Sequence, residues 1–159
     1  MSFEGMKKHS RTGESVKVVR LSAEEQERRI HEAVARRAYE IFEGRGATGS
    51  HDREDWFQAE SQVLPPFGCG SMPLEGAFWV GTNANAFCEG TIELWVAPSR
   101  LTICGNPQDQ PRKAMIYHVI ELPVEVDPSW VKPKFNESSL EILLKTSKTE
   151  EECRLQAAA

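Results

Sequence analysis

Apolar residues recur at helical spacing in the first half of the chain. Through residues 30–42 they follow intervals of three and four, which predicts an amphipathic helix with one buried stripe. Ser22 and Glu25 are spaced as in a capping box, in which the serine oxygen accepts a hydrogen bond from a free backbone N–H. Gly44 and Gly46 then favour the end of this helix.

A second, shorter helix is predicted after a glycine-rich loop. Either Ser50 or Asp52 can cap its first turn, and it is expected to reach about Leu64, where Pro65-Pro66 stops it. Two short helices with facing apolar stripes form an αα-hairpin. The apolar face of the second helix holds Trp56, Ala59 and Val63.

From Phe78 onward the pattern changes from helical to alternating. Residues 91–96 alternate in polarity, and residues 101–104 return as the second strand of a hairpin. Many short strands with closely spaced turns indicate an antiparallel sandwich. The fold class predicted is therefore an all-β, immunoglobulin-like antiparallel sandwich preceded by a small αα-hairpin. Further strands are expected at 115–122, 130–135 and 140–144, with a corner at 123–128.

The predicted organisation has five parts along the chain. Residues 1–20 carry five Lys and Arg against two acids, and we expect a disordered basic tail. The helical hairpin takes residues 21–64. Residues 65–76 hold three prolines and three glycines and are predicted to form a linker. The sandwich takes residues 77–146, and residues 147–159 form a frayed tail or a short helix.

The charge distribution argues against nucleic acid as a partner. The net charge of −5 opposes non-specific binding to nucleic acid or to an anionic membrane. Residues 21–64 hold six basic and ten acidic residues. Basic and acidic residues at spacings of three and four favour surface ion pairs over a DNA-binding face. The arginines concerned are Arg28, Arg29, Arg36 and Arg37, interleaved with Glu25, Glu32, Glu40 and Glu43.

The cysteines and the hydropathy of the chain indicate the cellular compartment in which the protein is expected. The four cysteines form no CxxC pair, which argues against a zinc site. No stretch resembles an export signal, and no apolar run approaches the length of a membrane span. We therefore expect a cytoplasmic protein with reduced cysteines. They are Cys69, Cys88, Cys104 and Cys153.

Residues that could carry catalysis or bind a metal are scattered. His118 lies in the alternating pattern of a strand, which is more typical of a surface or rim histidine than of a general base. Residues 51–54, HDRE, stand at a predicted helix start, where acids are expected for capping. The chain has no G-x-S-x-G motif, and no G-K-[ST] follows the glycines of residues 68–76. We expect no enzyme activity, no metal and no cofactor.

The helical part resembles a small helical-hairpin family found in bacteria and without known function. Residues 37–42, RAYEIF, carry the resemblance together with a glycine-rich loop. Asp55-Trp56 and Ala59-Glu60 complete it. The resemblance covers about 40 residues and implies no activity.

The β part resembles the α-crystallin domain of small heat-shock proteins. Residues 92–96 and 100–105, IELWV and RLTICG, stand where the family has I-x-V-x-V and R-L-T-I-x-G. Residues 120–128, IELPVEVDP, are similar to its F-x-L-P-x-x-V-D-P corner, and residues 138–142, SSLEI, to its G-V-L-x-V. The resemblance covers about 70 residues. It implies an α-crystallin-like sandwich that binds exposed apolar surface on other proteins without ATP.

Several departures from the family concern assembly. Ser138-Ser139 replaces the family's Gly-Val, and Lys145 replaces the proline that usually ends the last strand. The end of the chain lacks the Ile-x-Ile-type motif that builds large oligomers in the family. The loop of residues 106–113 is also short, whereas bacterial and plant members carry a strand there that swaps into a partner. We expect a monomer or small oligomer.

The resemblance also implies a groove for clients. In the family, apolar peptide segments bind between the counterparts of strands 91–96 and 130–135. If the alternate apolar residues of the first strand face the core, Trp95 faces out, as an exposed contact or beneath the helical hairpin or linker. Pro133 removes a backbone donor and predicts an edge strand, where binding would depend on side-chain pockets. The candidate client or partner contacts are Trp95, Val96, Val131, Pro133 and Phe135.

Three functions are compatible with these features. The first is an ATP-independent holdase that binds unfolding proteins. The second is an adaptor without chaperone activity, in which the sandwich holds one partner and the helices another. The missing tail motif and the short loop favour this second function. The third is a nucleic-acid-binding regulator that uses the basic tail and the first helix.

The oligomeric state of the protein in solution tests whether these departures from the family prevent its usual assembly. A loop of eight residues at about 3.3 Å per residue is too short to reach a partner sheet and pair there. We expect size-exclusion chromatography with light scattering to give a monomer or small oligomer. A large, polydisperse assembly at micromolar concentration would contradict this.

Overall fold

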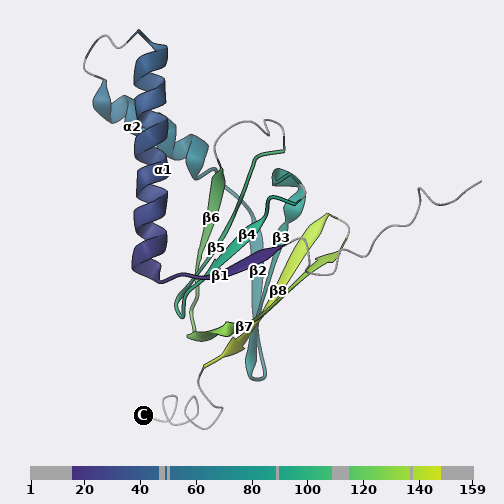
Figure 1. The fold of residues 1–159 in the computed structure, drawn as a ribbon. Helices are drawn as coiled ribbons and strands as arrows, with labels where there is room; N and C mark the ends of the chain where they lie inside the picture. The colour runs from purple at the N-terminus through teal and green to yellow at the C-terminus, as the bar shows by residue number, and fades with distance from the viewer. Residues whose placement is uncertain are drawn as a thin grey trace, which may run out of the picture.

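The computed structural model describes residues 16–46, 49, 51–88, 90–108, 115–136 and 138–147. A short strand leads into two helices, and seven further strands follow (Figure 1). In chain order the elements are β1 (Lys17–Arg20), α1 (Ala23–Gly44), α2 (Asp52–Val63), β2 (Cys69–Leu74), β3 (Ala77–Asn83), the 3-10 helix η3 (Ala84–Ala86), β4 (Glu93–Val96), β5 (Arg100–Gly105), β6 (Ile116–Glu121), β7 (Val126–Asn136) and β8 (Ser139–Thr146).

The strands form two four-stranded sheets. One has the order β1-β4-β5-β6 and the other β2-β3-β8-β7. Every pair of neighbouring strands is antiparallel except β1 and β4, which run parallel. The predicted antiparallel sandwich with an αα-hairpin is therefore confirmed, and so is the hairpin of β4 and β5.

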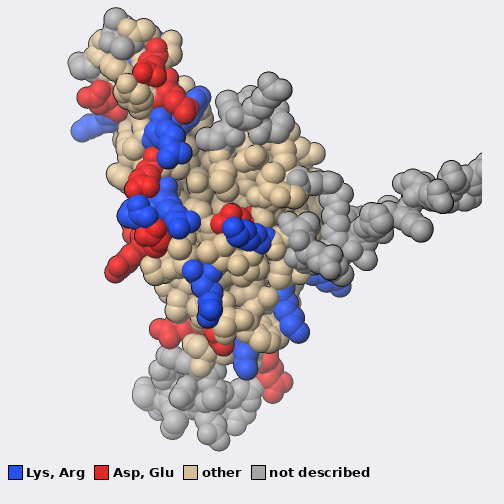
Figure 2. All heavy atoms as spheres, in the orientation of Figure 1, with Lys and Arg blue, Asp and Glu red and all other residues tan. Residues whose placement is uncertain are grey.

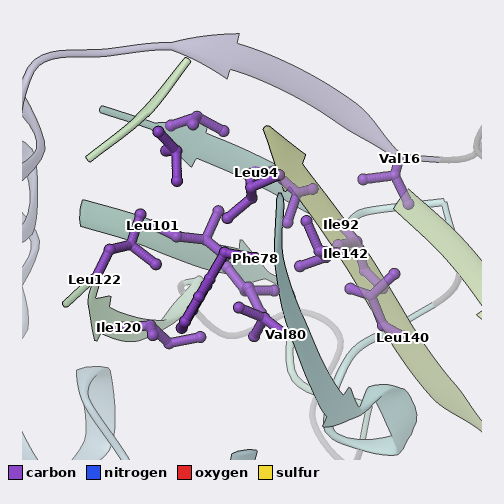
Figure 3. Packing of buried hydrophobic residues seen from close by; sticks show 14 of the residues in the cluster. Val16, Phe78, Val80, Ile92, Leu94, Leu101, Ile120, Leu122, Leu140 and Ile142 are labelled. Carbon is purple, nitrogen blue, oxygen red and sulfur yellow. The ribbon is translucent and has the colours of Figure 1, made fainter. Parts of the chain in front are cut away.

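The core of the sandwich follows from alternation along the strands. Successive side chains point to opposite faces, so every second residue enters the space between the sheets. Burying one such side chain contributes roughly 1.5–3 kcal/mol, and this cluster is the main source of stability in the sandwich. Figure 3 shows it with Phe78 and Val80 of β3, Leu94 of β4, Leu101 of β5, and Leu140 and Ile142 of β8.

The start of α1 confirms the predicted serine cap. The Ser22 hydroxyl accepts a hydrogen bond from the Glu25 backbone N–H at 3.2 Å. The Glu25 carboxylate accepts hydrogen bonds from Arg28 and Arg29. These bonds, that from Arg28 above all, lower the pKa of Glu25 to about 2. The Glu25 carboxylate therefore forms ion pairs on the surface of α1.

The start of α2 differs from the prediction. His51 is the N-cap residue and its side chain caps no backbone N–H, whereas Asp52 is the first residue of the helix. Ser50 lies outside the described residues. The helix ends at Val63, with Leu64 as C-cap, directly before Pro65-Pro66 as predicted. None of the helices in the described part of the chain is long and apolar enough to cross a membrane.

The helical hairpin packs on the outer face of the β1-β4-β5-β6 sheet (Figure 1). Residues from both helices and from three strands form a second hydrophobic cluster, which we call the hairpin cluster. It covers the face of this sheet that points away from the sandwich core. Its buried members are Ile30 and Val34 of α1, Ala59 and Val63 of α2, Trp95 of β4, Cys104 of β5 and Tyr117 of β6.

The structure corrects two of the predicted boundaries. Lys17–Arg20 is a strand, so the expected disordered tail of residues 1–20 is wrong for its last part. Residues 1–15 lie outside the described residues. The predicted linker of residues 65–76 contains β2, which pairs along its whole length with β3. The alternation of β1 is confined to residues 16–18 in a basic segment, and β2 has no alternating pattern, which is why the sequence did not reveal them. Of the predicted tail 147–159, only Ser147 is described.

A buried hydrogen-bonded chain joins α1 to the sheet. The Gln26 side chain is fully buried, and its Nε2 donates to the backbone oxygen of Leu21 at 2.8 Å. The Thr102 hydroxyl of β5 donates to Gln26 Oε1 at 2.7 Å. Buried polar groups that are paired in this way fix one orientation of a helix on a sheet.

We expect Thr102→Val to lower the free energy of unfolding by about 1–3 kcal/mol, because Gln26 Oε1 would stay buried without a donor. Urea denaturation measures the change. Ser61→Ala is the control, since it removes an exposed hydroxyl that donates to Gln58 and should alter stability by less than about 0.5 kcal/mol. Equal effects of both variants would contradict a structural role for the buried pair.

Candidate functional site

Three of the predicted client contacts lie on β7. Strand β7 is at the edge of its sheet, as Pro133 predicts. Its apolar residues pair with residues of β8 whose side chains are in the core, so they face into the sandwich. Lys132 and Lys134 face the other side and are exposed. The three half-buried residues that β7 contributes are Val131, Pro133 and Phe135.

The two predicted contacts on β4 separate to opposite faces of their sheet. Val96 lies in the sandwich core, against which Val131 and Phe135 pack. Trp95 lies in the hairpin cluster and is only 4% exposed. Neighbouring residues of a strand point in opposite directions, so the five predicted contacts do not line one surface. The alternative in which the helical hairpin covers Trp95 is the one that the structure has.

Trp95 anchors the helical hairpin to the sheet. Its indole N–H donates to Glu93 Oε1 at 2.8 Å, and its ring lies 5.3 Å from the Tyr117 ring. The Arg29 guanidinium of α1 lies 5.6 Å from the indole centroid. These contacts come from α1, β4 and β6, so Trp95 has a structural role and is not open to a client.

Strand β1 occupies the outer edge of β4. The Lys17 N–H donates to the Ile92 oxygen at 3.2 Å, and the Leu21 N–H donates to the Val96 oxygen at 3.0 Å. Val16 is buried in the sandwich core beside Ile92 and Leu94 (Figure 3). An extended segment of the chain itself therefore lies where a client peptide was expected.

The two faces of β1 contact both hydrophobic clusters. Val18 is in register with Leu94 and so faces the space between the sheets, but it remains 38% exposed. Val19 and Leu21 pack against the hairpin cluster on the other face. The only sequence signal for this strand is the short apolar alternation at residues 16–18, in a basic context that resembles a solvated tail.

The described residues form no cluster suited to catalysis. His118 is buried, so the expectation of a surface or rim histidine is wrong. The Cys104 thiol is also buried, and burial raises its pKa, which keeps it protonated and unreactive at neutral pH. Within the part of the chain that is described, no three His, Cys, Asp or Glu side chains converge on a possible metal position.

Three of the four predicted arginines of α1 pair with acidic residues of the same helix. Arg28 pairs with Glu25 and Glu32, and Arg37 pairs with Glu40 at 3.0 Å. Figure 2 shows acidic and basic side chains mixed along the helical hairpin. The predicted ion pairs are confirmed for these arginines and for Arg29, and this face carries no continuous basic patch of the kind that binds DNA.

The helical part matches a protein family. Residues 25–64 match a family described as "Protein of unknown function (DUF2934)". This confirms the predicted resemblance of the helical part to an uncharacterised family. No curated protein matches the chain.

The sandwich is similar to solved structures of heat-shock proteins. A mutant of hsp14.1 from Sulfolobus is 20% identical, with a TM-score of 0.47 over 57% of this chain and 83% of that chain. Heat shock protein 16.0 from Schizosaccharomyces pombe is 11% identical, with a TM-score of 0.45 over 53% and 89%. The rat alpha crystallin domain is 21% identical, with a TM-score of 0.34 over 51% and 95%. In each case the similar part is little more than half of this chain.

The structural role of Trp95 is testable by truncation. We expect Trp95→Ala to lower the free energy of unfolding by about 3–5 kcal/mol, because it leaves a cavity between helix and sheet. Phe57→Ala is the control: its ring on α2 is 62% exposed, so the change should be less than about 0.5 kcal/mol. Denaturant titrations of both variants measure this, and an unchanged stability of Trp95→Ala would refute the anchoring role.

Proposed function

We propose that the protein binds other proteins rather than catalysing a reaction, as an ATP-independent holdase of the small heat-shock type. The binding position is the edge of β4 together with the inward side of β7. In the described state β1 covers this position, and a client segment binds when β1 leaves. Clients are unfolding proteins that expose extended apolar segments.

The observation that carries this proposal is the pairing of β1 with β4. An extended segment adds to the edge of a sheet through main-chain hydrogen bonds, while alternate side chains give specificity. Here Lys17 and Leu21 supply such hydrogen bonds and Val16 supplies the buried apolar side chain. A client with apolar residues at alternate positions would make the same contacts.

The contacts of β1 are few enough for it to detach. Lys17 and Arg20 are exposed and Val18 is partly exposed, so Val16 and Val19 supply most of the burial along the strand. Exposing a buried valine costs roughly 1.5–3 kcal/mol, so detachment costs a few kcal/mol in total. Two such residues bring this cost to roughly 3–6 kcal/mol, so the detached conformation is populated to about 1% or less. Clients would bind to this minor population, in which β1 is detached from β4.

Further properties belong to the same proposal. We place the protein in the cytoplasm, in keeping with the three cysteines in the described residues, all of which are free thiols. A monomer or small oligomer is expected, because the proposed binding position is complete within one chain.

A second candidate function is favoured by exposed aromatic residues on the helical hairpin. Tyr39 of α1 and Phe57 of α2 are 60% and 62% exposed, in contrast to the rings buried in the hairpin cluster. Exposed aromatic side chains are typical of protein interfaces. An adaptor would use these residues for one specific partner. A pull-down that yields one dominant partner, lost on Phe57→Ala, would favour the adaptor over the holdase.

The holdase proposal predicts a gain of activity when β1 is weakened. Lys17→Pro removes the N–H that donates to Ile92, whereas Lys17→Ala keeps it. We expect Lys17→Pro to suppress heat aggregation of citrate synthase at about a two- to tenfold lower chaperone concentration than Lys17→Ala. Light scattering measures the aggregation, with each variant heated alone as a control.

One outcome would refute the holdase function, and another would refute the binding position at the edge of β4. One is that neither the unmodified protein nor Lys17→Pro suppresses aggregation at stoichiometric excess. The other is equal suppression by Lys17→Pro and Lys17→Ala, with the former still folded by circular dichroism. The second outcome would show that clients bind elsewhere on the molecule.

A further inference from the structure

A cavity of about 870 Å³ lies between the helical hairpin and one end of the sandwich. The C-terminal part of α2 and the following connection form one side, and the start of β6 with the segments near η3 and Pro107 forms the other. Its volume is in the range of pockets that hold small organic molecules. The proposed binding position at β4 and β7 does not include any residue of this cavity.

An unpaired polar side chain lies at the inner wall of this cavity. His118 of β6 lines the cavity and is only 2% exposed. Its Nδ1 is buried and has no hydrogen-bond partner among the described residues. A buried polar atom without a partner costs about 1–3 kcal/mol, so a ligand that supplies the missing hydrogen bond gains that energy on binding.

Aromatic rings hold the imidazole in place. The Phe67 ring stacks on it with centroids 4.2 Å apart and planes 1° apart, and the Phe87 ring lies at 4.9 Å. Phe67 also lines the cavity. Other apolar lining residues are Val63, Pro65, Pro66, Met115 and Ile116. Such walls suit a flat apolar ring system.

The charges of the lining favour an uncharged ligand. Burial lowers the pKa of His118 to about 4, so the imidazole is neutral near pH 7. The one cation in the lining, Arg37, is paired with Glu40, and its Nε donates to Gln62 Oε1 at 2.6 Å. An anionic ligand would therefore lose its hydration without gaining a free countercharge.

A hydroxyl group fits the imidazole best among uncharged polar groups. Neutral histidine has one nitrogen that donates and one that accepts. A hydroxyl can donate to the latter or accept from the former, and so it satisfies either tautomer. We infer that this cavity is a binding site for an uncharged aromatic molecule that carries a hydroxyl group, with His118 as its hydrogen-bond partner.

Three probes of nearly equal size test this site. They are 2-naphthol, 2-methylnaphthalene, in which a methyl replaces the hydroxyl, and the anion 2-naphthoate. Calorimetric titration into the full chain should show that 2-naphthol binds about tenfold more tightly than 2-methylnaphthalene. 2-Naphthoate should bind more weakly than both. Equal affinities of 2-naphthol and 2-methylnaphthalene, or no binding of 2-naphthol at about 1 mM, would overturn the assignment.

The matched variant is His118→Phe, which keeps a flat ring between Phe67 and Phe87 and removes the unpaired nitrogen. His118→Phe should bind both neutral probes with a ratio of affinities close to one, while Met72→Ala, an exposed residue of β2 outside the cavity lining, should keep the ratio of the unmodified protein. An unchanged preference for 2-naphthol in His118→Phe would overturn the role of His118. The side-chain ¹⁵N shifts of His118 in the unmodified protein give a second measurement. They should move with 2-naphthol, and no movement at saturation would count against the hydrogen bond.

Discussion

The parallel pairing of β1 with β4 sets the position of the whole helical hairpin. Ser22 caps α1 two residues after β1 ends, so the direction of β1 determines where this helix begins on the sheet. From that start, Gln26 reaches the Thr102 hydroxyl and α1 covers Trp95. A four-residue strand has little stability by itself. It persists because Val16 enters the sandwich core while Val19 packs against the hairpin cluster.

The edge of β4 therefore has two possible occupants. A segment joined to α1 is held close to this edge at a high effective concentration, and any external strand must compete with it. This competition allows one fold to serve either a holdase or a more selective adaptor, according to the free energy of detaching β1. The cavity beside His118 is spatially separate, since its lining includes the helical hairpin, the connection to β2 and β6, the strand at the other edge of the sheet from β1.

The local pattern of apolar and polar residues was sufficient to predict the helices and strands that have strong periodicity. The stripe of α1, the Ser22 cap and the hairpin of β4 and β5 were predicted because each depends on residues close in sequence. Strand β1 was missed because its partner β4 lies far along the chain and because Lys17 and Arg20 resemble a basic tail. Strand β2 pairs with the adjacent β3, but it contains a glycine and a proline, which are unfavourable in strands. Trp95 is separated from the other candidate contacts for a related reason: its burial depends on helices that local alternation on β4 cannot reveal. His118 was misjudged because Phe67, from a segment predicted as a linker, encloses it.

The separation of β1 from its partner along the chain has a consequence for biosynthesis. The ribosome releases β1 and both helices before β4 exists, and chains begin to fold from the N-terminal side during synthesis. Lys17–Arg20 therefore has no partner strand at the stage of synthesis at which the helical hairpin can already form. The pairing with β4 closes a long loop, and it can form only once β4 has been synthesised. The docking of the N-terminal strand can therefore come later than the formation of the helical hairpin that follows it in the sequence.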